Sequence, residues 1–137
     1  MASIQEVGLA VKRLQWHHHR TANVRLASLG LSLVQWDVLR HLDARPGASL
    51  HDLALLTFQT DQSMGALAGR MVQRGLLVRV EGAGRAVRHD LTPQGKEARA
   101  AGGEVVDLIL RESLGTLAPE QLDQLHELLT LAVPASP

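Results

Sequence analysis

The stretch TDQSMGALAGRMVQRGLLVR, residues 60–79, determines the fold that the sequence predicts. Its apolar side chains recur at intervals of three and four residues, at Met64, Leu67 and Met71, with Ala68 beside them. This spacing predicts a helix with one buried face, for which Thr60 is a suitable N-cap and Gly75 a suitable C-terminal stop. Residues 76–80 then follow the pattern of a short strand. A helix that ends at glycine and leads into a hairpin indicates a winged helix-turn-helix.

The segments on either side extend this interpretation to a mainly helical α+β fold with a small β-wing. We expect helices over residues 4–29, 33–44, 49–56, 61–74, 93–114 and 119–133. We expect two strands, over residues 76–80 and 86–91, joined by the turn 81–85. The short link at 57–59 makes the third and fourth helices a helix-turn-helix pair. Gly102-Gly103, inside the fifth helix, marks a bend or a close contact.

The first helix has a nearly heptad apolar stripe, which begins with Ile4, Val7, Val11 and Leu14. One such helix cannot bury its stripe against a small domain alone, so we expect it to pack against a second chain. The whole of 1–137 is then one domain with two parts. Residues 32–92 are expected to form a DNA-binding lobe, and residues 4–29 and 93–133 the dimerisation helices.

Composition excludes several classes of function. The absence of cysteine excludes disulfides, thiolate metal sites and thiol redox sensing. No apolar run approaches the ~18 residues of a membrane span, so a soluble cytoplasmic protein without membrane association is expected. The net charge of zero conceals a basic middle of the chain and an acidic region beyond residue 99, which fits one half that faces a polyanion. Scattered solvated charge explains the same pattern about equally well.

Four sequence segments and their order resemble the MarR family of bacterial transcriptional regulators. They are LSLVQWDVLRHL, SLHDLALL, GRMVQRGLLVR and LTPQGKEA, and the resemblance spans about residues 7–133. It implies a homodimer with interlocked first, fifth and sixth helices and two winged-helix lobes that read a pseudo-palindromic operator, most simply as a repressor. It also implies release from DNA when a small aromatic or phenolic anion binds between the dimerisation and DNA-binding parts.

The predicted DNA-contacting residues lie on the fourth helix, at helix starts and on the wing. Gln62 and Ser63 can donate and accept hydrogen bonds, as base edges and phosphates require, although they also suit an ordinary exposed helix face. Arg85 at the glycine-rich wing tip suits the electronegative minor groove, and a solvated turn arginine is the alternative. The full set is Ser49, Thr60, Gln62, Ser63, Ala66, Arg70, Arg85 and Arg88. Of these, Arg70 and Arg88 fit phosphate contacts and simple ion pairs equally well.

Two departures from the family pattern leave a second function open. Ala83 stands where the wing tip of the family commonly has aspartate, and Gly65 and Ala66 stand where its recognition helix usually has threonine and arginine. With fewer hydrogen-bond donors on its exposed face, this helix makes few direct contacts to base edges, or recognition depends on DNA shape. The alternative is therefore a dimeric winged-helix module that binds protein and has weak or lost DNA binding. No pattern of catalytic residues is present, so we expect no enzyme activity and no cofactor.

The run Trp16-His17-His18-His19-Arg20 is not required by the family. Side chains on a helix fan out by ~100° per residue, so three adjacent histidines cannot bind one metal, and none is expected here. His18 falls in the apolar stripe, where an interface histidine is the simpler interpretation. The functional alternative is a sensor pocket for an aromatic anion. Its expected lining is Trp16, His17, His18, Arg20, Trp36 and His41.

Overall fold

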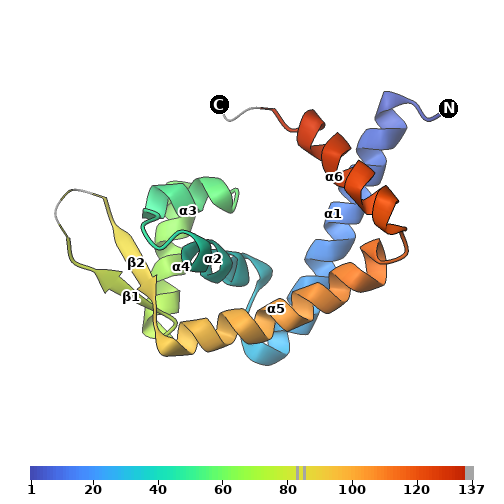
Figure 1. Cartoon of the computed structure of the whole chain (residues 1–137). Coiled ribbons are helices and arrows are strands. Elements are labelled where there is room, and N and C mark those ends of the chain that lie inside the picture. Colours follow the sequence, from blue (N-terminus) through green and yellow to red (C-terminus); the bar gives the residue numbers. More distant parts are fainter. Residues whose placement is uncertain (83, 85, 135–137) are drawn as a thin grey trace.

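The chain forms helices over most of its length and one antiparallel hairpin, as predicted (Figure 1). The computed structural model describes residues 1–82, 84 and 86–134. Its helices are α1 (Ile4–Leu26), the 3-10 helix η1 (Ala27–Leu29), α2 (Leu33–Ala44), α3 (Leu50–Leu56), α4 (Asp61–Gln73), α5 (Pro93–Leu114) and α6 (Pro119–Ala132). Its strands are β1 (Leu77–Val80) and β2 (Arg88–Leu91). They pair in a register that sets Leu77 opposite Leu91 and Val80 opposite Arg88.

The elements divide into a lobe and a separate group of helices, joined by α5. In Figure 1, α2, α3, α4 and the hairpin lie together on one side, and α1 and α6 lie on the other. The long helix α5 starts beside the hairpin and contacts both α2 and α1. None of the helices in the described ranges has the length and hydropathy that a bilayer crossing requires.

Local capping explains where most helices begin. The N-cap predicted at Thr60 is present, and Ser32, Ser49 and Thr92 cap their helices in the same way. Each side-chain oxygen accepts a backbone N–H three residues later. Ser32 and Ser49 form full capping boxes, in which Gln35 and Asp52 accept from the cap's own N–H. Ala118 has no such side chain, and there Gln121 alone accepts from the backbone of the cap.

Two element boundaries differ from the prediction by more than one residue. The first α-helix ends at Leu26 rather than at residue 29, because its last turn tightens into η1 before the left-handed Gly30 (φ 71°). The second strand begins at Arg88 rather than at residue 86. The carbonyl of Val87 accepts from the backbone N–H of Leu50 on α3 at 2.8 Å, so the chain here is tied to α3 instead of extending the hairpin.

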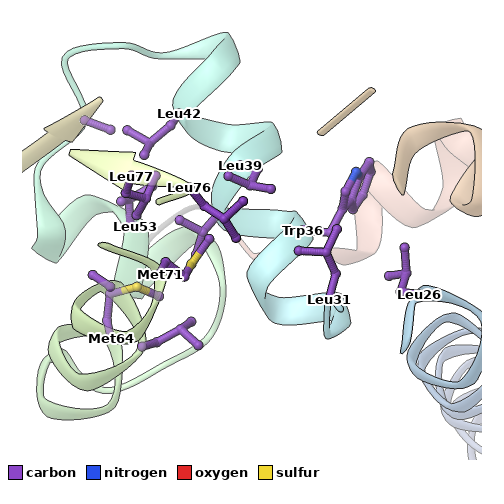
Figure 2. Packing of buried hydrophobic residues seen from close by; sticks show 14 of the residues in the cluster. Leu26, Leu31, Trp36, Leu39, Leu42, Leu53, Met64, Met71, Leu76 and Leu77 are labelled. Atoms are coloured by element: carbon purple, nitrogen blue, oxygen red, sulfur yellow. The ribbon is translucent and has the colours of Figure 1, made fainter. Parts of the chain in front are cut away.

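The core of the lobe lies where α2, α3, α4 and β1 meet (Figure 2). Its fully buried side chains include Leu39, Leu53, Met64, Met71 and Leu77. The predicted inner face of α4 is confirmed, because Met64, Leu67, Ala68 and Met71 are all buried. The packing of α4 on one face therefore leaves its opposite face at the surface of the lobe.

Candidate functional site

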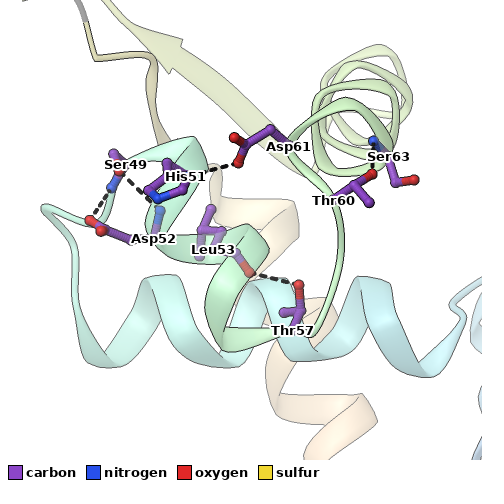
Figure 3. Close-up of polar contacts among 8 residues, drawn as sticks. All are labelled: Ser49, His51, Asp52, Leu53, Thr57, Thr60, Asp61 and Ser63. Carbon is purple, nitrogen blue, oxygen red and sulfur yellow. Dashed lines mark hydrogen bonds and ion pairs between the residues drawn. The ribbon is translucent and has the colours of Figure 1, made fainter. Parts of the chain in front are cut away.

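The link between α3 and α4 holds the two helices as a helix-turn-helix (Figure 3). Thr57 donates its hydroxyl to the carbonyl of Leu53 at 2.6 Å, and the backbone N–H of Gln59 donates to Ala54 at 2.8 Å. Between them, Phe58 has a left-handed backbone with φ of 59°, which is costly for a side chain other than glycine. Its ring is 94% exposed and gains nothing from the core. The sharp turn is thus held by a side-chain hydrogen bond before the strained residue and a backbone hydrogen bond after it.

The exposed face of α4 carries the side chains predicted to face DNA. Gln62, Ser63, Ala66 and Arg70 are all exposed. Thr60 and Ser49 serve as caps: the hydroxyl oxygen of Thr60 accepts from the N–H of Ser63 at 3.0 Å, and that of Ser49 from Asp52 at 3.1 Å. Each hydroxyl retains its proton for donation to a phosphate. The surface combines small, polar and basic side chains along one side of the helix-turn-helix.

The wing contributes basic side chains beside this surface. Arg88 is exposed at the start of β2, and its Nη1 donates to the carbonyl of Gly47 at 3.1 Å. Residue 88 also forms an isolated bridge with Ser49, which sets the base of the hairpin against the start of α3. The tip residues Ala83 and Arg85, on which the minor-groove prediction depends, lie outside the described residues.

One pair in this region was missed by the sequence reasoning. His51 Nδ1 on α3 lies 2.8 Å from Asp61 Oδ1 at the start of α4 (Figure 3). The hydrogen bond that His51 donates to Asp61, together with the negative charge of Asp61, raises the pKa of His51 above its usual value. The sequence places Asp52 next to His51, but Asp52 is turned toward Ser49. Nothing in the sequence marks a partner ten residues away.

A largely apolar cavity of about 620 Å³ lies between α1, α2, α5 and α6. This volume is within the range of small-molecule sites in proteins. Its polar side chains are those of Gln15, His18 and His19 on α1 and of Asp37 and Arg40 on α2. Its apolar wall includes Val11, Leu14, Ala22, Leu33, Trp36, Val106, Ile109, Leu110 and Leu125.

The predicted pocket residues are only partly brought together here. His18 and Trp36 line the cavity, whereas Trp16, His17, Arg20 and His41 lie outside its lining. Trp16 is 55% exposed and stacks on the ring of His19 with centroids 5.7 Å apart. The helical fan of side chains turns Trp16, His17 and Arg20 away from the cavity, whereas His18 and His19 both line it.

The prediction omitted four polar lining residues, namely Gln15, His19, Asp37 and Arg40. Arg40 was detectable from spacing, since it is four residues after Trp36 on one helix. Its guanidinium carbon lies 4.8 Å from the Trp36 ring centroid, and its Nη2 pairs with Asp37 Oδ1. Burial raises the pKa of Asp37, an effect that Arg40, His41 and His19 oppose.

The histidines of the cavity are held by hydrogen bonds rather than by charge. His18 Nε2 and the hydroxyl of Ser113 on α5 share a hydrogen bond of 2.9 Å, and Asn23 Nδ2 lies 3.1 Å from His19 Nε2. Burial lowers the pKa of His18, so this ring is neutral at pH 7. Among the described residues that line the cavity, Arg40 is the only lysine or arginine, so its positive charge persists across the physiological pH range. Within the described ranges, no group of three potential ligands is placed to hold a metal ion.

Trp36 joins the cavity to the long helix α5. Its indole Nε1 donates to the carbonyl of Arg99 at 3.0 Å, and the side chain is only 5% exposed. A Cβ placed on Gly102 would lie 2.4 Å from Trp36 Cδ1, so the ring occupies the space of a missing side chain. Of the bend or close contact predicted at Gly102-Gly103, the structure shows the close contact, at Gly102. The lobe is therefore locked to α5 through a residue that also forms the cavity wall.

Known proteins resemble this chain in sequence over one segment and in fold over nearly its whole length. Residues 29–86 match the model of the MarR family. None of the curated proteins matches the chain in sequence. A MarR family transcriptional regulator from Rhodococcus sp. RHA1 superposes with a TM-score of 0.86 at 19% identity, over 100% of this chain and 99% of that one.

Two further solved structures are similar and hold ligands of their own. A mutant of E. coli MarR complexed with operator DNA has a TM-score of 0.82 at 18% identity, over 93% of this chain and 94% of that one. The Mycobacterium tuberculosis MarR family protein Rv2887, in complex with salicylic acid, has a TM-score of 0.76 at 23% identity, over 97% of this chain and 98% of that one. The winged-helix segment thus matches the MarR family model in sequence, and nearly the whole chain has the fold of these solved MarR family structures.

Proposed function

We propose that the chain is a sequence-specific DNA-binding transcriptional regulator, a repressor that binds a pseudo-palindromic operator as a homodimer. The observation that carries this proposal is the outer face of α4, where Gln62, Ser63 and Arg70 are exposed on a helix whose other face is buried in the lobe. Such a helix suits the major groove, with the flanking hydroxyls and Arg88 placed for phosphates. The similarity in fold to a regulator solved with operator DNA supports the same placement.

Unpartnered apolar surface supports the homodimer. Ile4 on α1 is 91% exposed, and Val7, Leu9 and Val11 on the same helix are exposed as well. Helix α6 has no buried residue, and Leu128, Leu129 and Leu131 are exposed along it. Exposed apolar side chains in such numbers mark a surface that another chain covers. A second copy of this chain would join the two lobes and present two α4 helices to one duplex.

We infer that a small aromatic anion binds in the cavity and regulates DNA binding. The indole of Trp36 offers a flat apolar wall, and Arg40 can donate to a carboxylate or phenolate. Rv2887, solved with salicylic acid, has this fold. A ligand that contacts Trp36 would act on the joint between α2 and α5. It can change DNA affinity only as far as it prefers one position of the lobes over another.

DNA binding is tested with the full chain and the duplex that flanks its own gene, by fluorescence anisotropy at rising salt. We expect affinity to fall steeply with salt and to fall further in Gln62→Ala and Arg70→Ala. Gln124→Ala on α6 is the matched control, because Gln124 is exposed outside the lobe. Absence of salt-sensitive binding to this duplex and to a random-sequence pool would refute the regulator and favour the protein-binding module.

The dimer and the effector need separate measurements. Sedimentation at micromolar concentration should give about twice the chain mass, and a folded monomer would refute the dimer. Salicylate should quench tryptophan emission and release DNA over the same concentration range. Quenching without release would show a binding cavity that has no regulatory role.

A further inference from the structure

The ion pair between His51 and Asp61 joins the two helices of the helix-turn-helix at its outer surface. The two side chains are 64% and 68% exposed, and Nδ1 lies 2.8 Å from Oδ1. His51 lies in the first turn of α3, and Asp61 is the first residue of α4, directly before the exposed Gln62 and Ser63. The pair thus occupies the same edge of the lobe as the proposed DNA contacts.

Of the charged groups near His51, Asp61 has the largest influence on its pKa. On α4, Asp61 acts on His51 through a hydrogen bond and through its charge. On α3, Asp52 is a weaker influence, since its carboxylate accepts from the backbone N–H of Ser49 and is compensated by Arg45 and Arg88. With Nδ1 bound to Asp61, the Nε2 of His51 is the ring nitrogen left to contact a ligand from outside the lobe.

We propose that His51 is a proton-dependent phosphate contact that also shields DNA from the Asp61 carboxylate, so that operator affinity rises as the pH falls. This inference rests on the proposed DNA binding of the lobe. When His51 is neutral, the pair has the charge of Asp61 alone and repels the polyanion. When the ring is protonated, the pair is neutral overall and Nε2–H can donate to a phosphate oxygen, with charge assistance.

The coupling between protonation of His51 and DNA binding determines how much the DNA affinity changes with pH. DNA favours the protonated ring, so the complex takes up protons and the pKa of His51 is higher in the complex than in the free protein. If DNA binding raises the pKa of His51 by roughly half a unit in each of two lobes, DNA affinity is about tenfold higher at low pH than at high pH. The gain should appear between about pH 8 and pH 6, above the range in which the buried histidines of the lobe take up protons.

The test measures anisotropy of the full chain with one labelled duplex from pH 6.0 to 8.5 at constant ionic strength. The wild type should bind about tenfold more tightly at the acidic end. His51→Gln should bind with nearly constant affinity across this range, whereas Asp61→Asn should bind severalfold more tightly than the wild type at pH 8.5. His126→Gln, a change of an exposed histidine on α6, should keep the wild-type profile.

A second measurement does not depend on variants. The imidazole resonances of His51 in the wild-type protein, followed by NMR with and without the duplex, should titrate at a higher pH in the complex. An unchanged midpoint, or a pH profile that survives in His51→Gln, would overturn the inference while leaving the regulator intact. If the wild type binds DNA at no pH, the proposed function itself fails, and the two failures are therefore distinguishable.

Discussion

The adjacent glycines of α5 should respond in opposite directions to alanine. In Gly102→Ala, the new Cβ would lie 2.4 Å from Cδ1 and 2.9 Å from Nε1 of Trp36, far inside van der Waals contact. In Gly103→Ala, its nearest neighbour is Trp36 Cζ2 at 3.9 Å, an ordinary contact. The two substitutions make the same change of residue type in the same helix, one position apart. Any difference between them therefore reports the Trp36 contact.

The magnitudes follow from the opposing contributions to stability. Overpacking against the buried indole costs ~1–3 kcal/mol, and loss of the bond from Nε1 to the Arg99 carbonyl leaves a buried donor unpaired at a further ~1–3 kcal/mol. Alanine recovers ~1 kcal/mol of helix propensity. We expect Gly102→Ala to lower the free energy of unfolding by roughly 1–5 kcal/mol and Gly103→Ala to raise it by up to ~1 kcal/mol.

Urea denaturation followed by circular dichroism measures both free energies, at one protein concentration because an oligomer's stability depends on it. In a Trp16→Phe background, Trp36 is the sole tryptophan of the chain, and its emission should shift to longer wavelength only in Gly102→Ala. Equal stabilisation by both alanines, with unchanged emission, would refute the assignment of Gly102 as the packing site of Trp36.

Three other outcomes follow from single features of the structure. Phe58→Gly should stabilise the chain by ~1 kcal/mol in urea, because glycine relieves the left-handed backbone and the ring is exposed; Phe58→Ala should not. Burial lowers the pKa of His89, whose Nδ1 has no hydrogen-bond partner among the described residues. The unfolded chain therefore binds the proton first, and the melting temperature should fall as the pH drops below about 6.5; His89→Gln should lose this part of the pH dependence. Salicylate affinity by calorimetry should weaken in Trp36→Phe and stay unchanged in Trp16→Phe, and the reverse order would move the anion site to the exposed face of α1.

The secondary-structure elements and much of their burial follow from patterns within the amino-acid sequence. Caps such as Ser49 and Thr60 bond to groups three residues away, and Gly75 adopts the left-handed turn expected of it (φ 78°). These interactions are short in sequence and nearly independent of what surrounds them. The stripe through Met64 and Met71 is likewise a property of helix geometry, so the buried face of α4, and with it the exposed face proposed for DNA, could be predicted.

The tertiary structure alone decided which side chains from different elements meet. His51 pairs with Asp61 rather than with its neighbour Asp52 because α3 and α4 cross at a particular angle. The cavity includes Arg40 and excludes Trp16 because the rotation of α1 and α2 about their axes, set by packing on α5, turns one side chain inward and the other outward. Crossing angles and helix rotation result from many weak contacts summed over the core, and no spacing within one helix encodes them.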